Sequence, residues 1–253
     1  MIRVYATQEE CLDGLKGLAS ERSADVVVLL GKPEDVVAQG ELLDDLEVQF
    51  VVLGRFEDTH PNWIQIDYDH EQMVRRAVEH LASLGHRRIA YLGYQMDSPF
   101  CFHLLRGYRW AMNAVLGVDA PNELEGSVIP GLILGSLPGQ MAKWWALPAE
   151  AQPTAIVIGT AQSLVWNAFE ADLAKRGMEL GYGPGKLAAA GLAADNLVLL
   201  NGSAHVYAGL GHIDYARLAA EQLLVPILNG QPLEHRIVRV TPELTPIQAY
   251  PSK

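Results

Sequence analysis

The sequence lacks the features that mark secreted and membrane-spanning proteins. Its 253 residues include only two cysteines, Cys11 and Cys101, which lie far apart and belong to no CxxC or Cys/His pattern. This scarcity argues against a disulfide scaffold or a zinc site and suits a reducing cytoplasm. The start, MIRVYATQEE, lacks the basic and apolar segments of a signal peptide, and no apolar run reaches the length of a membrane span. We therefore expect a cytoplasmic protein with no membrane contact.

Positive charge is also scarce. The chain has 19 Lys and Arg against 30 Asp and Glu, a formal net charge of −11 and a pI of about 5.1. A domain that grips DNA should show a basic patch or stripe. Because the chain as a whole shows none, it is not expected to bind nucleic acid by itself.

No catalytic or metal-binding pattern stands out. The eight histidines show no HExxH spacing, and there is no GxSxG elbow. The run Gly181 to Lys186, GYGPGK, superficially resembles a phosphate loop, but such a loop needs a strand before it and Ser or Thr after the lysine. Here a predicted helix precedes the run and Leu187 follows it, so we interpret it as a turn. We expect no enzyme activity, no catalytic residue, no metal and no cofactor.

The sequence does show helices and strands in alternation. Apolar residues make up 49% and charged residues 19%, the balance of a well-buried globular protein. Helices are predicted over 9–22, 33–46, 102–116, 141–147, 162–176 and 213–228, strands over 2–6, 24–30, 48–54, 89–92, 127–130, 153–159, 187–192 and 236–240, and a loop over 131–139. This alternation predicts an α/β fold with right-handed crossovers and parallel sheets covered on both faces.

The stretch from Asp67 to Gly93 predicts a complete helix, turn and strand. Asp67 or Asp69 is placed to cap the helix, with Gln72 three residues after Asp69. Apolar residues then recur at helical spacing up to Leu81, and Gly85 provides the left-handed residue that ends a helix. We expect His86, Arg87 and Arg88 to hold the helix end rather than to contact a ligand.

This stretch also carries a family resemblance. AVEHLASLGHRRIAYLG is similar to the signature of the LacI/GalR family of bacterial transcription regulators, as are LRGYRWAM (105–112), PTAIVIG (153–159) and YARLAAEQLL (215–224) followed by NGQP. The resemblance implies two Rossmann-like subdomains of the type I periplasmic-binding-protein fold, with a ligand cleft between them. The implied subdomains are 1–94 plus 208–229 and 95–207 plus 230–253.

The chain departs from the family pattern at its start. Nothing resembles the family's DNA-binding helix-turn-helix, and residues 2–30 resemble the second strand, second helix and third strand of the family core. The first strand and helix of the core are therefore expected to be missing from this chain. A strand without its neighbour would expose a sheet edge, which favours unwanted pairing.

A second departure affects the expected ligand pocket. Family members commonly hold a small polar effector with an arginine where this chain has Leu104, an Asn-Asp pair where it has Thr160 and Ala161, and an aspartate where it has Ala193. Because unreplaced hydrogen bonds cost roughly 1–3 kcal/mol each, the usual sugar clamp is not expected, and a more apolar effector, or none, fits better. The candidate effector-binding residues are Arg55, Asp69, His103, Leu104, Thr160, Ala193, Asp195 and Leu210.

The resemblance implies the effector-sensing, dimerising core of a LacI-type transcription regulator. A small molecule of unidentified chemistry would shift operator affinity through a DNA-binding domain that is not in this chain. Two alternatives stay open: a solute-binding protein of a transport system, and a degenerate dimerising scaffold without an effector.

Overall fold

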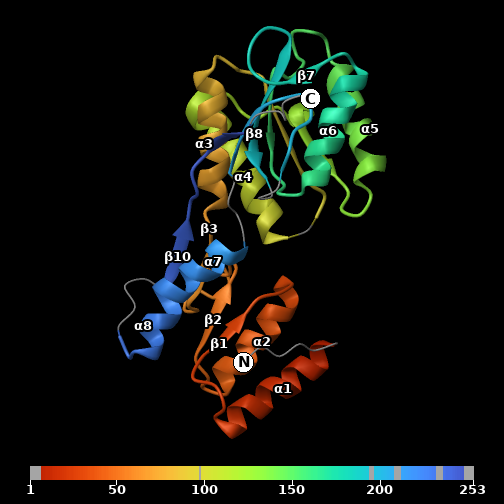
Figure 1. The fold of residues 1–253 in the computed structure, drawn as a ribbon. Coiled ribbons are helices and arrows are strands. Elements are labelled where there is room, and N and C mark those ends of the chain that lie inside the picture. The colour runs from red at the N-terminus through yellow and green to blue at the C-terminus, as the bar shows by residue number, and fades with distance from the viewer. Residues whose placement is uncertain (1–6, 97, 194–196, 208–211, 232–235, 248–253) are drawn as a thin grey trace. The chain divides into compact units, whose positions relative to one another are not determined.

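The computed structural model describes residues 7–96, 98–193, 197–207, 212–231 and 236–247 (Figure 1). The chain divides into two compact units: unit 1 comprises residues 1–68 and 212–240, and unit 2 comprises 69–211 and 241–253. The expected boundary at residue 94 is thus replaced by one at residue 68, because the segment 69–94 packs within unit 2. The expected strand over residues 2–6 lies outside the described residues.

Unit 1 is built on a parallel sheet with strand order β1-β2-β3-β10. Its elements are α1 (Gln8–Glu21), β1 (Val27–Leu29), α2 (Pro33–Asp45), β2 (Phe50–Leu53), β3 (Gln65–Tyr68), α7 (His212–Ala219), a π-helical turn (Ala220–Leu224), α8 (Val225–Leu228) and β10 (Ile237–Val240). The sequence analysis missed β3, because Gln65 and Asp67 break its apolar pattern. A long helix over 213–228 is confirmed, with the π turn inside it.

The side chains of β2 point alternately to the two faces of this sheet, and helices cover both faces. Phe50 and Val52 pack with the α1 and α2 side chains Leu15 and Leu43, whereas Val51 packs against the helical segment that follows residue 212. Successive side chains of a strand point to opposite faces. Four consecutive apolar residues therefore require a helical layer on each side, as a parallel sheet does.

The outer edge of β1 is open among the described residues, since β1 pairs only with β2. Val28 is 43% exposed and Leu30 is 70% exposed. A cavity of about 650 Å³ lies along this strand, lined by β1, by α1 residues such as Leu15 and by Leu228.

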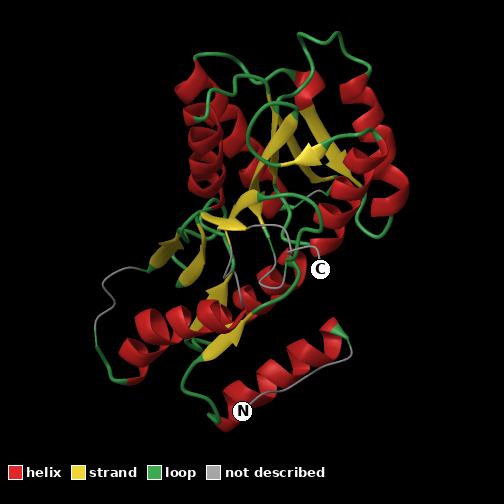
Figure 2. Cartoon of the chain, turned by 45° about the horizontal axis from the view of Figure 1, so that its top comes forward, coloured by secondary structure: helices red, strands yellow, loops and turns green. Residues whose placement is uncertain are grey.

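Unit 2 contains a larger sheet with strand order β11-β9-β8-β6-β4-β5, parallel except for the β9–β11 pair, and β7 pairs with β8. Its elements are α3 (His70–Ser83), β4 (Ile89–Tyr94), α4 (Pro99–Leu116), η1 (Asn122–Leu124), β5 (Glu125–Val128), α5 (Ile133–Trp145), β6 (Ala155–Ile158), α6 (Ser163–Lys175), β7 (Glu179–Leu180), β8 (Lys186–Leu192), β9 (Ala204–Tyr207) and β11 (Thr245–Ile247). Figure 2 shows the unit's helices flanking its strands. The turn predicted at 181–186 connects β7 to β8.

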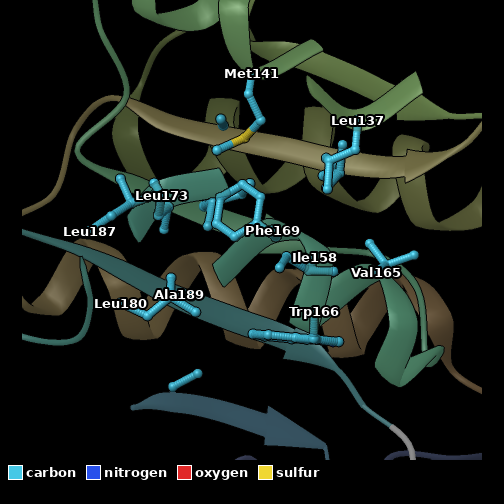
Figure 3. Close-up of a cluster of buried hydrophobic side chains, with 14 of the residues drawn as sticks. Leu137, Met141, Ile158, Val165, Trp166, Phe169, Leu173, Leu180, Leu187 and Ala189 are labelled. Carbon is cyan, nitrogen blue, oxygen red and sulfur yellow. The ribbon is translucent and has the colours of Figure 1, made fainter. Parts of the chain in front are cut away.

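The core of unit 2 lies between the sheet and the pair α5 and α6. Phe169 and Leu173 of α6 pack between Met141 of α5 and strand residues such as Ile158 (Figure 3). The loop predicted over 131–139 is wrong, because α5 begins at residue 133. Its buried side chains at 133, 137, 141 and 144 recur at helical spacing, and their burial outweighs the cost of Pro138 within the helix.

The opposite face of the sheet carries α3 and α4, which pack against each other. Asp69 caps α3 by accepting a hydrogen bond from the Gln72 N–H at 3.0 Å, so of the two predicted caps Asp69 is confirmed and Asp67 is wrong. Gly85 ends the helix with a φ of 93°, as predicted. His86 and Arg88 hold the next segment: His86 Nδ1 lies 3.1 Å from Thr154 Oγ1, and Arg88 donates to the Gln152 carbonyl.

The close approach of α3 to α4 depends on Gly107. A Cβ atom at this position would lie 2.7 Å from the Cα atom of Glu71, closer than van der Waals contact allows.

We expect Gly107→Ala to lower the free energy of unfolding by about 1–3 kcal/mol, the usual cost of overpacking, as measured by urea denaturation. The control is Gly139→Ala in α5, where nothing lies within 4 Å and the change should stabilise by up to about 1 kcal/mol. Equal stability of Gly107→Ala and the wild type would contradict this close packing.

Candidate functional site

Each unit has one edge where the carboxyl ends of its parallel strands meet. Ligands of open α/β sheets bind at this edge, because loops and helix N-termini converge there. In unit 2 the edge comprises the end of β4 at Tyr94, the residues that follow β6 and β8, and the starts of α3 and α4. In unit 1 it comprises the ends of β2, β3 and β10.

The unit 2 edge is aromatic and apolar. Phe100, at the start of α4, packs edge-on against His70, at the start of α3, with ring centroids 4.8 Å apart. Tyr94 ends β4, and burial raises the pKa of its hydroxyl, while the Thr160 hydroxyl acts in the opposite direction. Leu104 and Ala193 are fully buried. These two positions therefore provide apolar packing and no charged or hydrogen-bonding side chain.

The polar candidates of unit 2 have partners within the chain. His103 is 3% exposed, and its Nδ1 lies 2.9 Å from Glu71 Oε1. Glu71 also accepts hydrogen bonds from Arg106. Thr160 is fully buried and accepts from the Gln162 N–H at 3.2 Å. Asp69, as the cap of α3, is likewise engaged. These side chains therefore hold the segments at this edge together.

The candidate residues are thus divided between the two units. Asp69, His103, Leu104, Thr160 and Ala193 belong to unit 2, and Arg55 belongs to unit 1. Asp195 and Leu210 lie outside the described residues. A metal site is not indicated, since no group of three or more His, Cys, Asp or Glu among the described residues could hold an ion.

The unit 1 edge is charged, in contrast to that of unit 2. Arg55 follows β2, and its Nη2 lies 2.7 Å from Glu57 Oε1. Arg239, on β10, forms an ion pair with the other oxygen of Glu57. Asp67 of β3 is the register partner of Arg239. Sequence reasoning identified Arg55 only. The signal for the others is a charged residue inside a short apolar strand, as in IVRV (237–240) and QIDY (65–68).

The protonation of Asp67 is set mainly by desolvation. Burial raises its pKa to about 7, while hydrogen bonds from the Tyr68 N–H and from Tyr215, together with the charge of Arg55, act in the opposite direction. Tyr215 also donates a hydrogen bond to the Ile66 carbonyl and stacks on Tyr68 with ring centroids 5.0 Å apart. The carboxyl group is therefore partly protonated at neutral pH.

Asp67→Asn should change the pH dependence of stability. Because the folded pKa, about 7, exceeds the reference value of 3.8, the folded state binds more protons between these values, and stability falls as pH rises through this window. The variant should lack this fall and be more stable than wild type at pH 8 by about 1–2 kcal/mol, a figure reduced for partial exposure. Urea denaturation from pH 4 to 8 measures it, with the exposed Asp25→Asn as control. Parallel curves for wild type and Asp67→Asn would contradict the elevated pKa.

Comparisons with known proteins were consistent with one fold. No protein-family model and no curated protein matches the sequence. Among solved structures, a regulatory protein of the LacI family from Chloroflexus aggregans matches with a TM-score of 0.73 and 22% identity, over 97% of this chain and 83% of the other. A sugar-binding LacI-family regulator from Escherichia coli, complexed with phosphate, matches with a TM-score of 0.68 and 19% identity over 94% and 80%.

A third structure, the transcriptional regulator CelR in complex with cellobiose, matches with a TM-score of 0.64 and 19% identity, over 93% of this chain and 68% of the other. These identities establish the fold but not the ligand.

Among the described residues, no helix is long and apolar enough to span a membrane. The chain has the two-unit α/β fold, with predominantly parallel sheets, that is found in the effector-binding cores of LacI-family transcription regulators.

Proposed function

We propose that the chain is the effector-sensing core of a LacI-type transcription regulator. The observation that carries this proposal is the match over 97% of the chain to a LacI-family regulator, with both carboxyl edges of the core retained. Its similarity to regulators rather than enzymes also agrees with the absence of a catalytic pattern in the sequence. The described residues contain no DNA-binding domain, so the proposed core acts on operator DNA through another domain.

The proposed effector has apolar or aromatic character where it meets unit 2. Leu104 and Ala193 bring no hydrogen-bonding side chain to this edge, and Thr160 is already bonded to the Gln162 N–H. A sugar would lose hydrogen bonds to water here without full replacement. The rings of Tyr94 and Phe100 offer faces on which an apolar or aromatic group can pack.

The mechanism proposed is a population shift. A ligand changes operator affinity only if it binds one conformation of the core more tightly than another. The protein works in the cytoplasm as a homodimer in this proposal, because two copies then present two DNA-binding domains to a two-fold symmetric operator. Sedimentation equilibrium tests the dimer directly.

A thermal-shift screen over aromatic acids, nucleosides, sugars and apolar metabolites should identify a stabilising ligand. For such a ligand, Phe100→Ala should weaken binding about tenfold, the cost of roughly 1.4 kcal/mol expected for a lost aromatic contact. The matched control is Phe102→Ala, two residues along the same helix, where the ring is 60% exposed. Isothermal titration calorimetry measures both.

A fusion tests the regulatory claim. With a LacI-type DNA-binding domain joined ahead of residue 1, the ligand should change operator affinity by about fivefold or more, as measured by fluorescence anisotropy. A flat thermal response across all ligand classes would refute effector sensing, and a ligand that binds without changing operator affinity would refute regulation.

A further inference from the structure

Three side chains from separate segments of unit 2 meet near the end of α3. His80 lies in the last turn of α3, Tyr182 lies in the turn between β7 and β8, and His205 lies on β9. The ring centroids of His80 and His205 are 3.9 Å apart, and those of Tyr182 and His205 are 5.2 Å apart. We call these residues the histidine cluster. It lies at the opposite end of α3 from the carboxyl edge of unit 2.

Tyr182 determines which nitrogen of His205 carries the proton. The Tyr182 hydroxyl donates to the Ala189 carbonyl of β8 at 3.1 Å, and its oxygen lies 2.6 Å from His205 Nδ1. A hydroxyl has one hydrogen and a carbonyl only accepts, so the Nδ1–H group of His205 must donate to the tyrosine oxygen. The lone pair of the neutral imidazole is therefore on Nε2, and a second proton can bind only there.

His80 is held where its cation is disfavoured. Its Nε2 atom is buried and makes no hydrogen bond to any described residue. An imidazolium carries N–H groups on both ring nitrogens, so a protonated His80 would have a buried, charged donor with no acceptor among the described residues. Leaving a buried donor unpaired is destabilising, and a cation on the adjacent His205 ring would repel the charge as well.

The titratable groups that face His80 are His205 on β9, His86 after α3 and Tyr182. Burial, then His205 and then His86 lower the pKa of His80, and burial lowers the pKa of His205. Burial raises the pKa of Tyr182 to about 12, so its hydroxyl stays neutral. The residues that pair with His205 on β8 and β11 have no titratable side chain. The carboxyl end of a helix favours a cation, but burial and the two nearby histidines outweigh this effect at His80.

We propose that the histidine cluster is a pH-sensitive switch, which holds α3 against β8 and β9 when its histidines are neutral and releases this contact when they are protonated. This inference goes beyond the proposed function and does not depend on an effector. The folded protein binds protons at these histidines less tightly than the unfolded chain does, since the pKa of both is lowered from 6.5. The stability that the cluster provides is therefore complete above about pH 6.5 and is lost as the pH falls further.

Urea denaturation between pH 5 and 8 tests the switch. A histidine that stays neutral in the folded state raises the equilibrium constant of unfolding roughly 30-fold over this range, given its ordinary pKa of about 6.5. Because His80 is only partly buried, we expect His80→Gln to reduce the rise seen in the wild type by about tenfold.

The control is Lys175→Gln, which removes a cation from the last turn of another helix, α6. A lysine side chain does not titrate in this range, so the pH dependence should match that of the wild type. Equal pH dependence of His80→Gln and the wild type would overturn the proposal.

Hydrogen exchange shows whether the change is local. After correction for intrinsic rates, residues 179–187 should lose about tenfold in protection between pH 7.5 and 5.5 in the wild type, and much less in His80→Gln. Residues 122–128, which include β5 at the far edge of the sheet, provide the internal reference. An equal loss of protection at this reference would indicate global unfolding and would contradict a local switch.

Two further variants keep the test independent of any one substitution. His205→Gln should give the same reduced pH dependence as His80→Gln, and circular dichroism at pH 8 checks that each variant is folded. Tyr182→Phe keeps the ring but removes the hydroxyl that orients His205. In nitrogen–proton correlation spectra at pH 8, wild-type His205 should carry its proton on Nδ1, and Tyr182→Phe should lose this preference. A wild-type His205 protonated on Nε2 instead would overturn the hydrogen-bond arrangement on which the switch depends.

Discussion

Both sheets depend on the burial of parallel strands on two faces. Segments such as β2 and β6 are apolar at every position, and a strand of this kind is stable only where helices cover both sides. Hence α1 and α2 cover one face in unit 1 and α5 and α6 cover one in unit 2. The same constraint leaves few polar side chains in the interior, and those present, such as Gln65 and Glu170, hydrogen-bond to the backbone. The candidate functional groups of both units accordingly lie near the ends of the strands.

The sequence predicted elements well where one local signal dominated. The helix from 70 to 83 has a cap at Asp69, apolar residues at helical spacing and Gly85 after its end, and all three features agree. Prediction failed where local helix propensity and burial in the folded protein favour different structures. Residues 131–139 contain Gly135, Pro138 and Gly139, which disfavour a helix locally, yet Ile133, Leu137 and Met141 gain enough from burial to form one.

The candidate site was predicted less completely, for a related reason. Arg55 stands out in the sequence because a polar loop follows an apolar strand. Arg239 does not, since its significance comes from pairing with Asp67, which is 172 residues away in the chain. No periodicity connects β3 to β10. The sharing of Glu57 by two arginines is likewise a property of the folded sheet, which local sequence patterns do not encode.

The two edges offer opposite kinds of recognition. In unit 2, the residues at 104 and 193 remove charged contacts and leave apolar packing, so affinity there depends on the shape and hydrophobicity of the ligand. In unit 1, Arg55 and Arg239 both pair with Glu57, so that edge is charged. Specificity arises as much from what a site rejects as from what it binds. In the proposed function, the apolar positions 104 and 193 therefore disfavour the neutral sugars that arginine, asparagine and aspartate side chains would select.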